Sequence, residues 1–384
     1  MTNSEDITTR HVKQSYPSAQ SRDRILLIGP VLPYRGGIAQ HTTMLHRALK
    51  EQATCLTLSF SRQYPRWLFP GKSDRDENMA GHLEEGVEYI IDSVNPISWY
   101  RALKRAKTFA PRLVVFPWWH VYWAPCFIWF CRRFKKNGVE IVFLCHNAVE
   151  HESARWKSLI SDLVLSYADR FVVHTSVDQE SLAKRFPDKP TGIHPLPVFD
   201  CFPQPTSVLP RRAKLELLFF GFVRPYKGLD VLLDAMAQLK DEDIYLSIVG
   251  EFWNGESEAN EFIADHGIAD KVEIVARYVP DNQAANYFAR CDVVVLPYHS
   301  ATGSAVIPLA YHYGKPVIAT KVGGLPDVVE DGKTGSLIDS DSSKQLAAAI
   351  KAVLSGDTSY STGSIALFKT KLTWPGLANV VLGK

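Results

Sequence analysis

The sequence predicts an α/β protein built from two doubly wound parallel-sheet domains that face each other across a cleft. The chain has 384 residues, which is too many for one ordinary hydrophobic core. Short apolar runs of strand length alternate with amphipathic stretches of helical length in both halves of the chain. The aperiodic segment 198–213, which contains several prolines, separates the halves and predicts a linker.

Composition narrows the class of protein further. The hydrophobic share of 46% and the charged share of 22% are typical of a globular protein without a membrane span. The six cysteines include no CxxC pair, which favours reduced thiols in a cytoplasmic protein over a metal site. Residues 1–200 carry 26 basic and 20 acidic side chains, so this half either meets a membrane surface peripherally or has ordinary surface charge. Without a long Lys/Arg run, we expect no nucleic-acid partner.

The first half begins with a polar, unpatterned segment, 1–23, which predicts a disordered tail. In the predicted N-terminal domain, 24–197, a buried strand at 25–28 leads to Gly36-Gly37 and an amphipathic helix. A Gly-Gly turn that enters a helix lets a ligand phosphate approach backbone N–H groups. Because the GxGxxG spacing is missing, an NAD site has little support. Further strands are predicted at 53–60, 87–94, 113–116, 140–144 and 171–174.

Two groups of polar and aromatic residues follow strands of this domain. Trp118, Trp119 and His120 follow the strand 113–116 and lead into an apolar helix at 124–134. This stretch forms either a membrane-facing or acceptor-binding wall or part of an ordinary core; we favour the core for the helix and keep the loop as an acceptor candidate. The second group follows the strand 140–144, at the sheet end where open α/β proteins bind ligands. We expect a hydrogen-bonding site for a polar substrate here rather than a metal site. Its members are His146, Asn147, Glu150, His151 and Glu152.

The predicted C-terminal domain, 214–367, repeats the pattern. A strand at 215–220 ends at Gly221 and leads to a loop with Arg224 and Lys227. A basic pair at the C-terminal end of a strand favours an anion site. The strand 293–296 is followed by the small-residue turn 300–304 and a helix at 305–313, whose first N–H groups suit a phosphate. The remaining elements are strands at 244–250, 272–275 and 316–320 and a helix opened by Gly323-Gly324.

The C-terminal half resembles the retaining glycosyltransferase family 4, or glycosyl transferases group 1. FFGFVRPYKGLDVLLDAM is similar to the family's donor loop G-R-x-x-x-x-K-G-x-x-x-L, and the segment from CDVVVLPYHS to VVEDGKTG is similar to its D-x-x-x-x-P-S and G-x-P-V-I-A-x-x-x-G-G-x-x-E block. The resemblance covers essentially 24–384. It implies the GT-B fold, in which two Rossmann-like domains face a cleft and a C-terminal helix at about 368–384 returns to the N-terminal domain.

The resemblance implies a metal-independent transfer of sugar from a nucleotide diphosphate sugar to an acceptor hydroxyl, without a cofactor. Positive charge and N–H donors would stabilise the diphosphate leaving group. Lys227 would contact the diphosphate with Arg224 nearby, and His146 would contact the donor sugar, so these three are the expected catalytic residues. The expected donor contacts are Gly36, Gly37, Gly221, Tyr278, Thr302, Gly303, Ser304, Ala305 and Val306. The acceptor candidates are the two polar and aromatic groups of the N-terminal domain.

Three positions depart from the family pattern. The family arginine falls on Phe222, and Arg224, two residues later, either replaces it or is only a neighbour. The family's pair of glutamates, which contact the donor sugar and ribose, falls on Ala301 and Leu309. The usual glutamate after Gly-Gly is Asp327.

We therefore expect a retaining glycosyltransferase of surface polysaccharide or glycoconjugate assembly, cytoplasmic or peripheral on the cytoplasmic membrane face. Its partners would be a nucleotide sugar and a glycan or lipid-linked saccharide. Thr302, Ser304 or His299 would replace the lost glutamates in an active enzyme. The alternatives are a catalytically impaired relative that binds a nucleotide or glycan as a partner subunit and, with less support, another GT-B activity such as epimerisation of a sugar nucleotide.

Overall fold

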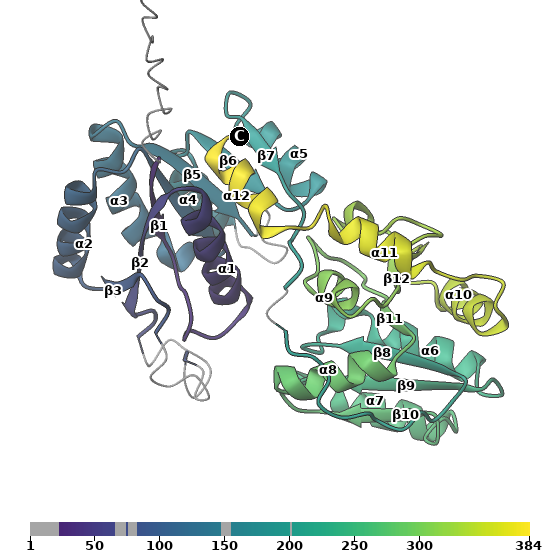
Figure 1. The fold of residues 1–384 in the computed structure, drawn as a ribbon. Coiled ribbons are helices and arrows are strands. Elements are labelled where there is room, and N and C mark those ends of the chain that lie inside the picture. Colours follow the sequence, from purple (N-terminus) through teal and green to yellow (C-terminus); the bar gives the residue numbers. More distant parts are fainter. Residues whose placement is uncertain (1–22, 66–73, 76–82, 147–154, 200–201) are drawn as a thin grey trace, which may run out of the picture.

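The computed structural model describes residues 23–65, 74–75, 83–146, 155–199 and 202–384. It contains two separate β-sheets, one in each half of the chain, and all strands of both sheets are parallel (Figure 1). The predicted α/β fold class with two doubly wound sheets is therefore confirmed. No helix among the described residues is long and apolar enough to cross a membrane.

The first sheet has the strand order β3-β2-β1-β4-β5-β6-β7, which is the doubly wound order extended by one strand. Neighbouring residues of β1 point to opposite faces, so both faces need a cover of helices. Leu26 and Ile28 pack with α2 (Pro96–Phe109) and α3 (Ala124–Lys136) on one face. Ile25 and Leu27 pack with α1 (Gly37–Gln52) on the other. The strands are β1 (Arg24–Ile28), β2 (Thr54–Arg62), β3 (Val87–Asp92), β4 (Leu113–Trp118), β5 (Glu140–Cys145), β6 (Arg170–Val173) and β7 (Thr191–Ile193). 

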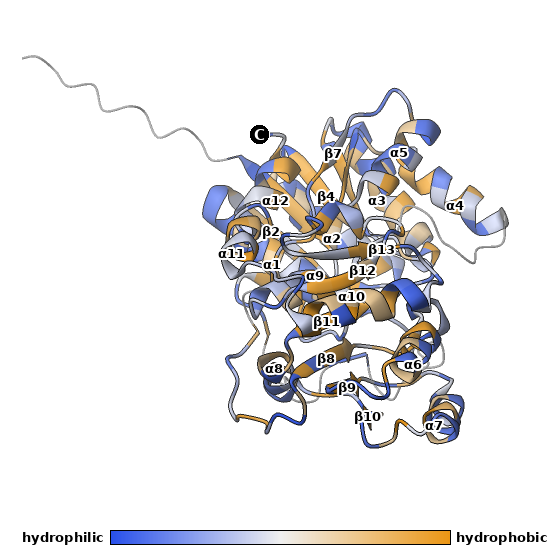
Figure 2. Ribbon diagram, turned by 90° about the vertical axis from the view of Figure 1, so that its right-hand side faces the viewer, coloured by the Kyte–Doolittle hydropathy of each residue, from blue (hydrophilic) through white to orange (hydrophobic). Residues whose placement is uncertain are grey.

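The second sheet has the order β10-β9-β8-β11-β12-β13 and is covered in the same way. Leu217 and Phe219 of β8 pack with α6 (Leu229–Gln238), α7 (Glu256–Asp265) and α10 (Ser343–Ser355). Leu218 packs on the other face with α8 (Asp281–Arg290), α9 (Val306–His312) and α11 (Thr362–Lys369). In Figure 2 the strands are mainly apolar, whereas the helices mix apolar and hydrophilic residues. The strands are β8 (Leu215–Phe220), β9 (Ile244–Val249), β10 (Val272–Val275), β11 (Val293–Leu296), β12 (Val317–Thr320) and β13 (Gly335–Ile338).

The last helix, α12 (Trp374–Leu382), lies against α1 in the lobe of the first sheet, although α11 just before it packs on the second (Figure 1). Leu377, Ala378 and Val381 share a buried cluster with Ile25 and Leu27 of β1. Arg170 also donates a hydrogen bond from Nη1 to the Val380 carbonyl, at 3.0 Å. The C-terminal helix is thus part of the core of the first sheet.

One local prediction changes in the structure, and another is confirmed. The helix predicted after Gly323-Gly324 is only a three-residue 3-10 turn, Pro326–Val328. Gly323 has φ of 52°, and the Gly324 N–H donates to the Thr302 carbonyl at 2.9 Å, so this backbone closes a turn instead of starting a helix. The aromatic helix after Trp123 is α3, and its apolar side chains are buried, which confirms the core interpretation of that helix.

Candidate functional site

The site begins where the order of the second sheet reverses. β8 and β11 are neighbours, and their connections leave to opposite sides, which is where open α/β sheets bind ligands. The loop after β8 carries Gly221 and Lys227, and the loop after β11 leads to Val306. A Cβ atom on Gly221 would lie 3.2 Å from the Lys227 Nζ and 3.9 Å from the Val306 Cγ2. The two predicted anion-binding loops therefore meet at this edge.

Lys227 is the most unusual charge at this edge. Lys227 is only 8% exposed, and its Nζ lies 5.6 Å from the ring centroid of Tyr298. No residue in the described part of the chain accepts a hydrogen bond from its ammonium group. Burial, and then the nearby Arg224 charge, lower the pKa of Lys227 to about 8. The backbone is held by Gly228, whose φ is 66° and whose Cβ, if present, would lie 2.0 Å from the Pro297 carbonyl oxygen. Only glycine fits there, so the loop fixes a buried cation without a counter-charge.

Arg224 lies beside this cation, but its guanidinium group already contacts another side chain. Its guanidinium carbon is 3.7 Å from the ring centroid of Trp253, a cation–π contact. The ring of Phe222, at the family arginine position, packs 5.9 Å from the same Trp253 ring. Arg224 thus adds positive charge near Lys227 from a stacked position on Trp253.

The loop before α9 offers backbone donors in place of acidic side chains. In the described structure, the N–H groups of Gly303, Ser304 and Ala305 donate no hydrogen bond to the chain, whereas the Val306 N–H donates to the Ser304 Oγ at 3.2 Å. Of the four N–H groups predicted to face a phosphate, Val306 is therefore already engaged. α9 is one short helix of seven residues.

The two positions of the family glutamates lie in the core. Ala301 and Leu309 are 9% and 5% exposed and belong to the buried cluster on one face of the second sheet. His299 is not a free replacement, because its Nε2 contacts Asp230 at 3.0 Å and its Nδ1 contacts Asp341. Burial lowers the pKa of His299, but these two carboxylates outweigh burial and raise it. The half-buried Thr302 is the remaining candidate with an uncommitted side chain in the described structure.

Loops of the first sheet face this edge across the cleft. The Arg35 guanidinium lies 5.6 Å from the ring centroid of Tyr278 in the other lobe. Ser176, at the start of α5 (Ser176–Arg185), donates from its backbone N to Asp327 at 2.7 Å and from Oγ at 2.9 Å. The aspartate at the family glutamate position thus connects the two lobes at a helix N-terminus.

The Gly-Gly turn lies at the start of α1 on this side. Gly36 has φ of 102°, which favours glycine, and a Cβ on either Gly36 or Gly37 would meet no atom within 4 Å. Packing therefore does not require glycine at position 37, and the backbone there is open to a ligand.

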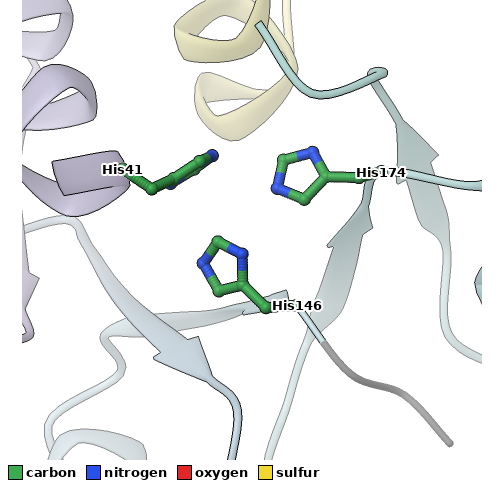
Figure 3. Close-up of side chains that lie close together, drawn as sticks. All are labelled: His41, His146 and His174. Carbon is green, nitrogen blue, oxygen red and sulfur yellow. The ribbon is translucent and has the colours of Figure 1, made fainter. Parts of the chain in front are cut away.

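Three histidines meet behind this turn (Figure 3). His41 comes from α1, His146 from the end of β5 and His174 from the end of β6. Their ring centroids are 4.5 to 5.2 Å apart. Burial, and then the neighbouring histidines, lower the pKa values of His41 and His146 well below the ordinary range. Burial lowers the pKa of His174 to about 4, so all three imidazoles are neutral at pH 7.

The predicted acceptor residues differ in where they lie and in how exposed they are. Trp118 is the last residue of β4 and is buried against Phe143, with its Nε1 donating to the Ser161 Oγ at 3.2 Å. It is part of the core and does not line a surface, because β4 lies inside the sheet and its pairing with β5 continues to Trp118. Trp119 is half-buried and His120 is exposed. The other predicted acceptor residues, Asn147, Glu150, His151 and Glu152, lie outside the described residues.

Sequence reasoning missed His41, His174 and the pair Ser176–Asp327. His41 follows Gly37 by one helical turn, and His174 directly follows the strand β6. A search for polar residues after every strand of the sheet, and one turn after the Gly-Gly pair, would have found both histidines. The pair Ser176–Asp327 joins residues 151 positions apart, which no local pattern indicates.

Comparison with known proteins agrees with this geometry. Residues 206–362 match the family model described as glycosyl transferases group 1. D-inositol 3-phosphate glycosyltransferase of Streptomyces scabiei is 33% identical over 198 residues, which covers 46% of this chain and 44% of that protein. The same enzyme of Thermobispora bispora is 30% identical over 249 residues, covering 57% and 58%. The chain thus spans about half the length of the curated relatives it matches.

Solved structures match over nearly the whole chain. The lipopolysaccharide outer core galactosyltransferase WaaB superposes with a TM-score of 0.69 at 15% identity, covering 94% of this chain and 99% of that one. Sucrose-phosphate synthase of Thermosynechococcus elongatus has a TM-score of 0.70 at 20% identity, covering 94% and 98%. Anabaena HepE, solved with UDP-glucose, has a TM-score of 0.65 at 17% identity, covering 94% and 98%. The chain has the GT-B fold, and its segment 206–362 carries the pattern of glycosyl transferases group 1.

Proposed function

We propose that the protein is a retaining glycosyltransferase that moves a sugar from a nucleotide diphosphate sugar to an acceptor hydroxyl on a glycan or lipid-linked saccharide. The acceptor would belong to surface polysaccharide or glycoconjugate biosynthesis. The observation that carries the proposal is the buried ammonium of Lys227, which has no carboxylate partner among the described residues. It lies at the strand-order reversal of a segment that matches glycosyl transferases group 1.

The charge of the donor explains why such a cation would be useful. When the glycosidic bond to the diphosphate breaks, negative charge develops on the leaving phosphate, and a preorganised cation stabilises it. Lys227 lies beside Gly221, and because glycine has no side chain, the space next to the ammonium group is not filled there. The N–H groups of Gly303, Ser304 and Ala305 lie on the adjacent loop. We propose that these groups bind the diphosphate and that no metal ion takes part at this position.

The remaining donor contacts come from both lobes. Tyr278, at the end of β10, would contact the nucleobase, and Arg35 already holds its ring from the other side of the cleft. Gly36 and Gly37 would approach the diphosphate from α1, and His146 would hydrogen-bond the donor sugar. Thr302 would take over part of the contact that the family glutamates make, since its hydroxyl is the uncommitted one in that loop.

The acceptor would enter from the first lobe. Trp119 and His120 lie after β4, next to the end of β5 that carries His146. α4 (Arg155–Leu165) in the same lobe exposes Trp156, Leu159 and Leu163, which follow one face of the helix. An exposed apolar face of this kind supports peripheral contact with a membrane that carries a lipid-linked acceptor.

A second function is favoured by one specific observation. Ala301 and Leu309 replace both family glutamates and are packed in the core, so no carboxylate reaches the donor from either position. A chain that binds a nucleotide or glycan without transferring sugar, and serves as a partner subunit, would have this feature. It would still use Lys227 for the phosphates.

Nucleotide titration, followed by a transfer assay, distinguishes the enzyme from the partner subunit. The purified chain is titrated with UDP, GDP, ADP and their sugars by calorimetry, and bound pairs are then incubated with saccharide acceptors while released nucleotide and product anomer are followed by NMR. Binding with transfer and retained configuration supports the enzyme, and binding without transfer or hydrolysis supports the partner subunit. If no nucleotide binds, the enzyme and the nucleotide-binding partner subunit are both excluded. Lys227→Met should weaken nucleotide binding by about 10- to 100-fold, whereas Lys240→Met at an exposed position is the matched control.

A further inference from the structure

The three histidines behind the Gly-Gly turn are positioned as ligands of one atom. They project from three different elements toward a common space, as Figure 3 shows. One ring nitrogen of each residue lies within 4.8 Å of the corresponding nitrogens of the other two. Because His41, His146 and His174 are held by a helix and two neighbouring strands, this convergence is a property of the fold and not of one mobile loop.

These imidazoles lack the partners that buried histidines normally have. His41 is 1% exposed, and neither of its ring nitrogens has a hydrogen-bond partner among the described residues; the same holds for Nε2 of His146 and of His174. His46, one helical turn further on, shows the usual arrangement, with Nδ1 at 2.7 Å from the Thr57 Oγ1 and Nε2 at 3.1 Å from the Glu85 carbonyl. These four buried ring nitrogens, without a partner among the described residues, therefore indicate a ligand.

A hydrogen bond behind the cluster determines which ring nitrogen of His174 carries the proton. His174 Nδ1 lies 2.9 Å from the His194 carbonyl oxygen, which can only accept, so Nδ1 carries the proton and Nε2 presents its lone pair to the cluster. A histidine that binds a metal commonly donates its other N–H to a backbone carbonyl in this way. The Trp374 ring of α12 packs 4.9 Å from the His41 ring and closes the cluster on that side.

We propose that His41, His146 and His174 bind a divalent transition-metal ion, with zinc as the expected ion. Neutral imidazole nitrogens are typical zinc ligands, and a donor set without carboxylate is a poor site for calcium or magnesium. A tetrahedral zinc site needs nitrogens about 3.4 Å apart, so the rings close by about 1 Å on binding. Three protein ligands leave one coordination position for water or substrate.

This site is distinct from the proposed diphosphate site. It lies in the lobe of the first sheet, whereas Lys227 lies in the lobe of the second. At His146 the enclosed nitrogen is Nε2, so Nδ1 stays available for the proposed contact to a donor sugar. The metal proposal can therefore be tested independently of sugar transfer.

The test measures metal content in the full chain, purified without a histidine tag. After reconstitution with zinc sulfate and removal of loose metal, we expect about one zinc per chain by plasma mass spectrometry. His41→Gln and His174→Gln should each lower zinc affinity by about 10- to 100-fold or more, as loss of a ligand does. The controls His46→Gln, which removes an equally buried histidine, and His266→Asn on the surface should keep the metal.

Cobalt substitution keeps the proposal testable if a histidine variant fails to fold. The unaltered chain loaded with Co²⁺ should show visible d–d bands of a tetrahedral nitrogen and oxygen site, without the sulfur-to-metal charge-transfer bands of a cysteine site. Retention below about 0.1 zinc per folded chain, a cysteine-type spectrum, or equal metal loss in the His46→Gln and His266→Asn controls would each overturn the proposal.

Discussion

Replacing Lys227 with methionine should stabilise the ligand-free protein and weaken nucleotide binding at the same time. The change keeps the length of the side chain and removes its charge. Burial, and then Arg224, lower the pKa of Lys227 from the ordinary 10.5 to about 8. At about 1.4 kcal/mol per pKa unit, holding the charged ammonium in the fold costs about 3 kcal/mol.

The pH dependence of this cost has a definite sign. Between pH 8 and 10.5 the unfolded chain binds more protons at Lys227 than the folded chain, so the free energy of unfolding rises with pH in that window. Below pH 8 the full cost is present. Lys227→Met should therefore raise the free energy of unfolding of the second lobe by up to about 3 kcal/mol at pH 7, and the difference from the unaltered chain should shrink toward pH 10.5.

Two measurements check this. Urea unfolding at pH 7 and at pH 10 gives the stability difference, and calorimetry gives the affinity for nucleotide diphosphates. Loss of a charge-assisted contact to phosphate should weaken binding by about 10- to 100-fold. The control Lys240→Met, at an exposed position, should change stability by less than about 0.5 kcal/mol and leave affinity unchanged. Destabilisation by Lys227→Met at pH 7, or unchanged nucleotide affinity, would refute the reasoning.

Three further predictions follow from single contacts. Gly228→Ala should destabilise the second lobe by about 2 kcal/mol or more in urea unfolding, because φ is 66° and the added Cβ would meet the Pro297 carbonyl; Gly314→Ala, with φ of 68° but open space around it, should cost less. Asp327→Ala should remove both bonds to Ser176, cost about 1–2 kcal/mol and increase the radius of gyration measured by X-ray scattering, and an unchanged radius would contradict its role in joining the lobes. In chelator-treated protein, stability should fall as pH drops from 6.5 toward 4, since the pKa of His174 is lowered to about 4; the His174 share is about 2 kcal/mol by pH 5, and His174→Gln should flatten this slope in acid titration.

The sheets could be predicted from sequence because a parallel strand buried on both faces leaves a local signal. Val293–Leu296 is apolar without interruption, and Glu216 is the one polar residue in the run Leu215–Phe220. The two runs end at a proline and a glycine, respectively. The donor-loop position of Lys227 followed from the same signal, since it lies a fixed distance after a strand. The burial of Lys227 did not follow, because burial depends on the loop from β11 that packs beside it.

The contacts between elements could not be predicted in this way. His41, His146 and His174 are separated by more than 100 residues of chain in total, and only the strand order β1-β4-β5-β6 brings them together. The sequence left open whether Trp118 lines an acceptor site or the core, and strand pairing with β5, which continues to this residue, places it in the core. Pattern reasoning identifies which loops carry function, and the sheet topology decides which of their side chains meet.

The state of Lys227 also bears on the choice between an enzyme and a non-catalytic partner subunit. A lone buried ammonium lowers stability, so it is expected where a ligand supplies the missing negative charge. Ala301 and Leu309, in contrast, cost the fold nothing, because both are apolar residues in an apolar cluster. The structure thus keeps the costly cation of the proposed diphosphate site, whereas apolar side chains stand where the family pattern has two glutamates. This combination predicts that affinity resides mainly in the diphosphate. Nucleoside monophosphates should then bind at least about 10-fold more weakly than diphosphates, and different bases should compete within a factor of about 10. A strong preference for one base with equal binding of its monophosphate would show that recognition rests elsewhere.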